Sequence, residues 1–339
     1  MELTGRRFLI TGGFSLIGSH IAEQVLAAGA AEVVLLDNAA TGSPASVEHL
    51  VPGGRVRIVR GDILRMDQVL QALEGVDGVF HTAALLTLGI SRDPWAGVDV
   101  NVRGLMTVLE ACRWRAVRRL IYSSSVAVYG NALGEIVTEE TPFLSVGVQP
   151  VAALYATSKL MGEQLCALYR ERHGVDGIAL RYSTVYGERQ HARGVNVLHI
   201  LEAYDRIRQG QPPVIPGDGR EVHDYVYAGD VARANLLAMG SDCSGEAFTI
   251  ATGVATSLEE LVRILLRLTG SALAPEYRPD GGRVRSAGAT EMRFSREKAA
   301  ARLGWTPEVS IEEGLRRLVA WREATTAGAA PPVKTQGGS

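Results

Sequence analysis

The stretch "RFLITGGFSLIGSHIAEQVLAAGAAEVVLLDN", residues 7–38, decides the fold of this chain. It opens with an apolar segment over 7–11 that predicts a buried strand, and continues over 17–29 with an amphipathic segment that predicts a helix. A second buried strand is expected over 31–37. A strand, a glycine-containing turn, a helix and a second strand in this order are typical of a dinucleotide-binding unit.

The turn of this unit departs from the usual glycine pattern at one position. Gly12 and Gly18 are in place, but Ser15 stands where TGxxGxxG has its middle glycine. The middle glycine lets backbone amides approach a pyrophosphate at the positive end of the helix. The Cβ of Ser15 crowds that approach, whereas its hydroxyl can donate a hydrogen bond to a phosphate oxygen. We therefore expect the dinucleotide to bind, with a lower affinity.

The acidic residue at the end of the second strand indicates which dinucleotide binds. Asp37 follows Gly18 by 19 residues. A carboxylate at this place accepts hydrogen bonds from the adenosine ribose hydroxyls and repels a 2′-phosphate. No arginine follows it in "DNAATG", residues 37–42. The sequence therefore favours NAD over NADP.

Strands and helices continue to alternate through the first half of the chain. Further strands are expected over 56–62, 77–84, 119–125 and 177–187, and helices over 67–75, 100–116 and 153–174. This alternation predicts an α/β fold with a doubly wound parallel sheet and right-handed crossovers, the Rossmann arrangement. We expect a dinucleotide-binding domain over 1–187, to which later segments can return, a smaller α/β substrate lobe mainly over 188–324, and a disordered tail over 325–339.

Composition narrows the class of protein. The 339 residues carry a net charge of −2, which lacks the basic excess of a nucleic-acid binder. No apolar run approaches ~20 residues, and a strand from Arg7 leaves no room for a signal peptide, so we expect no membrane partner. The three separated cysteines, Cys112, Cys166 and Cys243, are expected to be reduced and buried in a cytoplasmic protein. No histidine spacing indicates a metal site.

The segment "YATSK" supplies a candidate catalytic pair. Tyr155 and Lys159 are four residues apart, so on a helix their side chains share one face. The ammonium, together with the cationic nicotinamide of oxidised NAD, would lower the pKa of the phenol from ~10 toward neutrality. The phenolate could then take the proton of a substrate hydroxyl as its hydride leaves. The preceding strand ends in three serines, and Ser125 places a hydroxyl at the same edge of the sheet.

The whole set of motifs resembles one family. In chain order they include "TGGFSLIG", "VVLLDN", "RGDI", "FHTAA", "NVRGLMTVLEAC", "YSSSVAVYG", "YATSK", "LRYSTVYGERQ", "DYVYAGDVARA" and "LGWTPEVSIEEGL". Together they make the chain similar to the NAD-dependent epimerase/dehydratase family of extended short-chain dehydrogenases/reductases, from about residue 6 to 322.

The resemblance implies a set of cofactor contacts. The pyrophosphate turn, the adenosine ribose, the adenine and the nicotinamide ribose would be contacted by Gly12, Ser15, Leu16, Ile17, Gly18, Asp37, Asn38, Asp62, Ile63, Thr82, Ala83, Asn101, Ser123, Tyr155, Lys159 and Tyr182. Ser125 would hydrogen-bond the reacting hydroxyl, beside the catalytic Tyr155 and Lys159.

The resemblance also separates the chemistries of the family. Dehydratases carry an Asp-Glu pair after the catalytic hydroxyl and decarboxylases keep a glutamate, whereas here Val126 and Ala127 follow Ser125, and neither can move a proton. What remains is oxidation to a ketone and return of the hydride to the other face. The implied enzyme is an isomerase, an NAD-dependent nucleotide-sugar epimerase acting at carbon 4 through a 4-keto intermediate, with a UDP-sugar as substrate.

Departures from the family pattern fall in the substrate half. Ser183 and Thr184 replace the usual "FN", and His223 stands where an arginine usually grips the diphosphate. A histidine lacks the bidentate fork of arginine. The remaining substrate candidates are Asn196, Arg278 and Arg283, with Arg189, His191 and Arg193 adding positive charge nearby. The family also implies a homodimer through the helices expected over 100–116 and 153–172.

Three other functions stay open from the sequence. Thr184 and His223 are compatible with a dehydrogenase or reductase of a non-nucleotide alcohol, which would release NADH. A dehydratase or related lyase would need an acid from elsewhere in the chain. A non-catalytic NAD-sensing protein is suggested only by Ser15, and the Ser125–Tyr155–Lys159 set argues against it.

Overall fold

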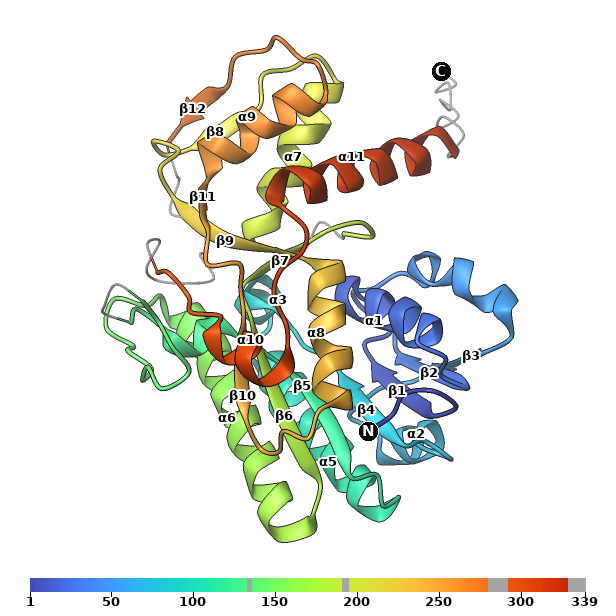
Figure 1. Cartoon of the computed structure of the whole chain (residues 1–339). Helices are drawn as coiled ribbons and strands as arrows, with labels where there is room; N and C mark the ends of the chain where they lie inside the picture. The colour runs from blue at the N-terminus through green and yellow to red at the C-terminus, as the bar shows by residue number, and fades with distance from the viewer. Residues whose placement is uncertain (133–135, 191–194, 280–291, 329–339) are drawn as a thin grey trace, which may run out of the picture.

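The computed structural model describes residues 1–132, 136–190, 195–279 and 292–328, with the side chains of 195–196 and 326–328 left out. Its centre is a seven-stranded sheet in the order β10-β6-β5-β4-β1-β2-β3, in which every neighbouring pair is parallel. The strands are β1 (Arg7–Thr11), β2 (Glu32–Asp37), β3 (Val56–Arg60), β4 (Gly78–His81), β5 (Arg119–Ser125), β6 (Asp176–Tyr182) and β10 (Ala247–Ile250) (Figure 1). The expected doubly wound Rossmann sheet is confirmed.

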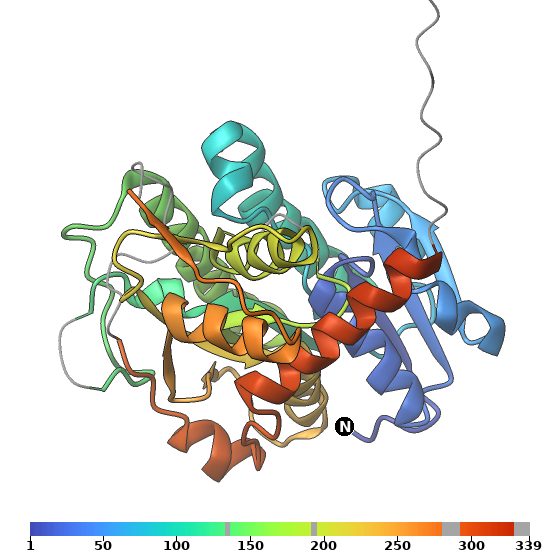
Figure 2. The ribbon, with the colours of Figure 1, turned by 90° about the horizontal axis from the view of Figure 1, so that it is seen from above.

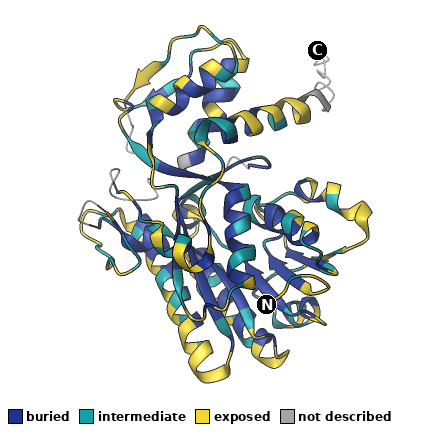
Figure 3. Cartoon of the chain, viewed as in Figure 1, coloured by how far each residue is buried: buried dark blue, intermediate teal, exposed yellow. Residues whose placement is uncertain are grey.

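Helices cover both faces of this sheet. One face packs against α1 (Leu16–Ala27), α8 (Ala228–Gly240) and α10 (Glu297–Leu303), and the other against α2 (Met66–Ala72), α5 (Leu105–Trp114) and α6 (Pro150–His173). Figure 3 shows buried residues concentrated in the sheet and on the inner sides of these helices. The strands are apolar on both faces because both are covered, as is usual for a parallel sheet.

A smaller lobe lies beyond the carboxyl ends of the strands (Figures 1 and 2). It holds the sheet β11-β9-β7, the pair β12-β8 and the helices α7, α9 and α11 around a separate apolar core. Their bounds are β7 (Thr184–Tyr186), β8 (Val214–Pro216), β9 (Val222–Tyr227), β11 (Ala255–Ser257), β12 (Glu276–Arg278), α7 (Val195–Arg208), α9 (Leu258–Leu268) and α11 (Ile311–Gly328). Because α8, β10 and α10 pack in the large domain, the chain crosses between the two cores more than once.

Two expected elements differ from the structure. The strand expected over 177–187 is divided into β6 and β7 at Ser183, whose hydroxyl donates a hydrogen bond to Asp224 over 2.8 Å. The chain leaves the large sheet at this residue and enters the sheet of the lobe. The helix expected over 100–116 begins with a π-helical turn, Asp99–Gly104, before α5.

The disordered tail expected over 325–339 is helical in its described part. Helix α11 continues to Gly328, and the residues after it lie outside the described part of the chain. Short helices complete the fold: α3 (Thr87–Arg92), α4 (Pro94–Val98) and the 3-10 turns Pro44–Ser46, Glu48–Gly53 and Val126–Tyr129.

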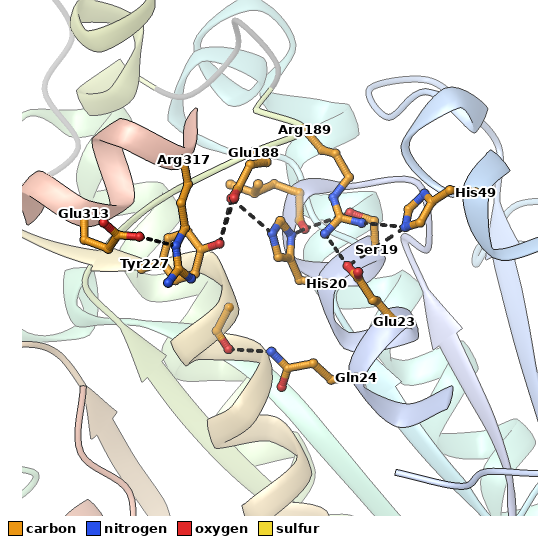
Figure 4. Close-up of polar contacts among 12 residues, drawn as sticks. Ser19, His20, Glu23, Gln24, His49, Glu188, Arg189, Tyr227, Glu313 and Arg317 are labelled. Atoms are coloured by element: carbon orange, nitrogen blue, oxygen red, sulfur yellow. Dashed lines mark hydrogen bonds and ion pairs between the residues drawn. The ribbon is translucent and has the colours of Figure 1, made fainter. Parts of the chain in front are cut away.

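Polar contacts tie helix α1 to the lobe (Figure 4). Glu188, in the loop after β7, accepts a hydrogen bond from the hydroxyl of Tyr227 over 2.8 Å and lies 3.7 Å from Nε2 of His20. Arg189 pairs with Glu23 of α1 over 2.7 Å. Arg189, which was expected to add positive charge near the substrate, is therefore ion-paired with α1 instead.

Three further properties of the described residues bear on the class of protein. The three cysteines are free and buried, as expected. None of the described helices combines the length and the apolarity that crossing a membrane requires. The described side chains also include no group of three or more His, Cys, Asp or Glu placed to hold a metal ion.

Candidate functional site

A cavity of about 820 Å³ opens at the carboxyl ends of the central strands. It lies where the strand order reverses, because the chain runs from β1 outward to β3 and then returns to β4 beside β1. Ligands of doubly wound folds bind at this switch point. The cavity brings together eleven of the residues predicted from the sequence: Ser15, Leu16, Ile17, Thr82, Ser123, Ser125, Tyr155, Lys159, Tyr182, Thr184 and His223.

The glycines of the first turn are required by the backbone. Gly12 has φ +70°, and a Cβ there would lie 2.9 Å from the amide nitrogen of Ala83. A Cβ on Gly18 would collide with the carbonyl oxygen of Gly12. These two positions allow β1, α1 and the loop after β4 to meet closely.

Ser15 does not need to be glycine. Its backbone is extended, with φ −74° and ψ 167°, and its side chain caps α1 by accepting a hydrogen bond from the amide of Gly18 over 3.0 Å. Its oxygen also lies 3.4 Å from the hydroxyl of Thr82. Serine is among the preferred residues at a helix N-cap. The substitution therefore supports the helix whose N-terminus faces the cavity.

Asp37, at the carboxyl end of β2, has a buried carboxylate with two backbone partners. Its carboxylate is 8% exposed and accepts hydrogen bonds from the amides of Phe14 over 2.9 Å and Ala39 over 2.7 Å. A carboxylate has about four lone-pair positions, so these two bonds leave positions for ribose hydroxyls. Beside it, Asn38 donates to Asp62 over 3.1 Å.

Three predicted cofactor residues lie behind the cavity wall. Asn101 is 2% exposed. Its side-chain oxygen accepts a hydrogen bond from the backbone amide of Leu85, and its side-chain nitrogen donates to the carbonyl of Leu85 and to the hydroxyl of Ser158. It holds the loop after β4 and is a positioning residue. Ile63 is buried, and Ala83 backs onto the glycine turn at Gly12. Sequence spacing indicated their neighbourhood correctly but could not indicate which way their side chains point.

Ser125, Tyr155 and Lys159 meet where β5 and α6 face one another. The hydroxyl of Ser125, which accepts a hydrogen bond from the amide of Ala127 over 3.2 Å, lies near enough to Tyr155 to lower the pKa of its phenol. Nζ of Lys159 donates to the carbonyl oxygen of Ser123 over 2.8 Å and lies 5.8 Å from the centre of the Tyr155 ring. The three residues of the predicted catalytic set are therefore gathered, with the lysine anchored to the strand.

Burial shifts the pKa values of Tyr155 and Lys159 in the chain alone. Burial raises the pKa of Tyr155 to about 12, and the hydroxyl of Ser125 opposes this only in part. Burial also lowers the pKa of Lys159 to about 8. The expected lowering of the pKa of the phenol involves the cationic nicotinamide as well as the ammonium, and it stays a prediction for the NAD-bound enzyme, because in the chain alone burial is the dominant influence on Tyr155.

The substrate candidates divide into those at the cavity and those away from it. Thr184 and His223 line it, and Nε2 of His223 pairs with Glu221 over 2.8 Å. Arg278 lies elsewhere, in a separate pocket on the lobe, and pairs with Glu276 over 2.8 Å. Arg283, His191, Arg193 and the side chain of Asn196 fall outside the described residues.

Sequence reasoning missed one cation at the cavity. Arg92 ends helix α3 and lines the cavity together with the preceding segment 84–89. It makes no hydrogen bond or ion pair with the other described residues.

The residues present fit a dinucleotide. The amides of Leu16 and Ile17, in the first turn of α1, have no acceptor within the helix and border the cavity, as pyrophosphate binding requires. The buried carboxylate of Asp37 suits an unphosphorylated ribose. From the first turn of α1 to Tyr155, the cavity is lined by residues at the carboxyl ends of β1, β4 and β5.

Comparison with known proteins agrees with this geometry. The sequence model of the NAD dependent epimerase/dehydratase family matches residues 8–251. The chain belongs to this family. NAD is accordingly its cofactor, and the resemblance seen in the motifs is confirmed.

Three members of the family show its range. A putative UDP-glucose 4-epimerase of Methanocaldococcus jannaschii is 34% identical over 319 residues, covering 92% of this chain and 97% of its own. The UDP-glucose 4-epimerase of Thermus thermophilus, solved with NAD, is 34% identical, with TM-score 0.81 and coverage of 94% and 99%. A dTDP-glucose 4,6-dehydratase of Streptomyces venezuelae, solved with NAD, is 28% identical, with TM-score 0.83 and coverage of 95% and 98%.

Proposed function

We propose that this chain interconverts nucleotide sugars that differ in configuration at carbon 4, with a UDP-sugar as substrate. The coarser assignment, an NAD-dependent sugar-nucleotide epimerase, follows from the family and the relatives. The finer one rests on Ser125, Tyr155 and Lys159, which line one cavity together with the dinucleotide turn. We also propose the contacts inferred from the sequence as the cofactor site, with Asn101 in a positioning role.

Each residue of the set has a role in this reaction. When bound, NAD supplies the hydride acceptor at the sugar carbon and later returns the hydride. Tyr155 takes the proton of the carbon-4 hydroxyl, which Ser125 orients, and the sugar becomes a 4-keto compound. Tyr155 then returns the proton to the oxygen once the ketone has turned its other face. Lys159 contributes positive charge that favours the phenolate.

The side chains after Ser125 favour epimerisation over dehydration. Val126 and Ala127 line the cavity where elimination of water would need an acid and a base. Neither can hold or move a proton. Oxidation and reduction at one carbon need only the Ser–Tyr–Lys set.

Charge at the cavity supports an anionic substrate. The family's usual arginine is replaced by His223, whose partner Glu221 balances positive charge there. Arg92 lines another part of the cavity. Ile90, on the same short helix, packs in one apolar cluster with Tyr155, so this helix lies next to the catalytic set. A guanidinium forms bidentate hydrogen bonds with phosphate or carboxylate. We propose that Arg92 binds the diphosphate or a sugar carboxylate.

We also propose a homodimer through α5 and α6. These helices carry exposed apolar side chains: Met106 and Trp114 on α5, and Met161 and Leu168 on α6, which are 42–58% exposed. A second copy related by a two-fold axis would cover this face with the same face of its own. Light scattering of the purified chain, and of a Met161→Glu variant, tests the association.

The decisive experiment for the reaction is product analysis. The purified chain is incubated with UDP-glucose or UDP-glucuronate, and the released sugars are separated. A new carbon-4 epimer without net accumulation of NADH supports the proposal. Steady NADH formation, with a keto product or from a simple alcohol, would instead identify a dehydrogenase.

A further inference from the structure

The three consecutive serines that end β5 have three different partners. The carbonyl of Ser123 accepts the hydrogen bond of Lys159, and the hydroxyl of Ser125 lies near Tyr155 and lowers the pKa of its phenol. Between them, the hydroxyl of Ser124 donates to Oε1 of Glu163 over 2.6 Å. The middle serine therefore ties the end of the strand to helix α6, one turn beyond Lys159.

Glu163 is held in turn by a buried arginine. Arg181 of β6 donates from Nε to Oε1 over 2.9 Å and from its terminal nitrogen to Oε2 over 2.7 Å, with the side chains of Arg181 and Glu163 11% and 8% exposed. Arg181 also donates to the carbonyl of Glu139 over 2.9 Å and to the hydroxyl of Tyr129 over 3.1 Å. This bidentate geometry fixes the carboxylate in one place.

We propose that Glu163 is a positioning residue of the reaction, which fixes the end of β5 through Ser124 and places a buried carboxylate one turn of α6 beyond Lys159. The inference rests on the proposed function, because it concerns the residues assigned to catalysis. It adds to the Ser125–Tyr155–Lys159 set a buried carboxylate that lies one turn of α6 beyond Lys159.

The charges around Lys159 agree with this role. Burial lowers the pKa of Lys159, and the carboxylate of Glu163 opposes that shift. Lys159 also acts on His81 of β4: burial, and then the charge of Lys159, lower the pKa of His81 to about 3. The ring centre of Tyr122 of β5 lies 5.2 Å from Nζ of Lys159. Tyr155 lies on the same helix as Lys159, α6. At neutral pH these three are uncharged in the chain alone, and the carboxylate of Glu163, which is itself paired with Arg181, is the anion that acts on the pKa of Lys159.

Two variants separate charge from tethering. Glu163→Gln removes the charge but keeps an oxygen that can accept from Ser124. Ser124→Ala removes the tether but keeps the charge. We measure NAD affinity and kcat/KM against pH, and call the fall of each at high pH its alkaline limb. We expect Glu163→Gln to move this limb to lower pH by about one unit, because the ammonium of Lys159 loses its counter-charge. We expect Ser124→Ala to lower kcat about fivefold, the value of one hydrogen bond, with the limb unmoved.

Asp176→Asn is the matched control. Asp176 pairs with Arg119 over 3.4 Å at the other end of the same strand pair, β5 and β6. The control should lower Tm and leave the alkaline limb and kcat at wild-type values. A Glu163→Gln variant with the same lowered Tm and an unmoved limb would show that Glu163 is only structural, and the proposal would be overturned.

Two further readouts keep the proposal testable. If Glu163→Gln does not fold, Ser124→Ala decides: a wild-type kcat at a wild-type Tm overturns the positioning role. NAD affinity against pH is measured without a sugar substrate. If no sugar is epimerised while the limb of NAD affinity still moves, the proposed reaction fails and the role of Glu163 toward Lys159 stands.

Discussion

The ammonium of Lys159 donates its hydrogen bond to the carbonyl oxygen of Ser123, 2.8 Å away, and does not ion-pair with the phenol of Tyr155. The lysine therefore supplies charge from beside the ring, with its nitrogen 5.8 Å from the ring centre. The proton acceptor of the proposed reaction is the phenolic oxygen alone.

Tyr155→Phe should consequently abolish turnover while leaving the fold and the cofactor site in place. We expect kcat to fall by about 10²–10⁴, the usual contribution of a general base. NAD affinity, measured by calorimetry, serves as the control and should change little. Turnover near the wild-type rate would contradict the assigned mechanism.

Arg92→Ala tests the cation at the cavity. Loss of a charge-assisted hydrogen bond should raise KM about tenfold with a smaller change in kcat. A rise for UDP-glucose and UDP-glucuronate alike would place the contact at the diphosphate, and a rise for UDP-glucuronate only would place it at the sugar carboxylate. Arg103→Ala, an exposed arginine paired with Asp99, is the control. Unchanged KM for both substrates would exclude Arg92 from the site.

Ser15 should stabilise the protein as a helix cap. Ser15→Ala removes the acceptor for the amide of Gly18 and should lower the free energy of unfolding by about 1 kcal/mol, whereas Ser15→Gly should cost only a few tenths. Urea denaturation of the two variants measures the difference. Equal losses would show that the hydroxyl does not act as a cap.

His81 should make the protein sensitive to acid. It is 2% exposed, and burial, with Lys159 nearby, lowers its pKa to about 3 from 6.5. As pH falls from 6.5 toward 3, His81 is protonated in the unfolded chain and stays neutral in the folded chain. The free energy of unfolding therefore keeps its full value above pH 6.5 and decreases below it. The slope approaches about 1.4 kcal/mol per pH unit.

The variant His81→Gln should remove this part of the slope while keeping a partner for Thr11, which bonds Nδ1 of His81 over 2.9 Å. Denaturant titrations across this pH range measure it. His173→Gln, at an exposed histidine, should leave the wild-type slope. Equal slopes in the wild type and His81→Gln would mean that another group titrates.

The sequence by itself determined the features that depend on neighbours along the chain. The apolar strand over 7–11, the turn at Gly12 and Gly18 and the following helix are local patterns, and they were sufficient to predict the parallel sheet and the dinucleotide site. The four-residue spacing of Tyr155 and Lys159 likewise put both on one helical face.

Only the tertiary structure decided what those residues meet. Ser124, Glu163 and Arg181 come from β5, α6 and β6, and no local pattern predicts that their polar atoms bond one another. Arg92 turns to the cavity and Arg278 away from it for the same reason. The pKa values of Tyr155 and Lys159 moved opposite ways because burial disfavours charge of either sign, and burial is a property of the packed molecule.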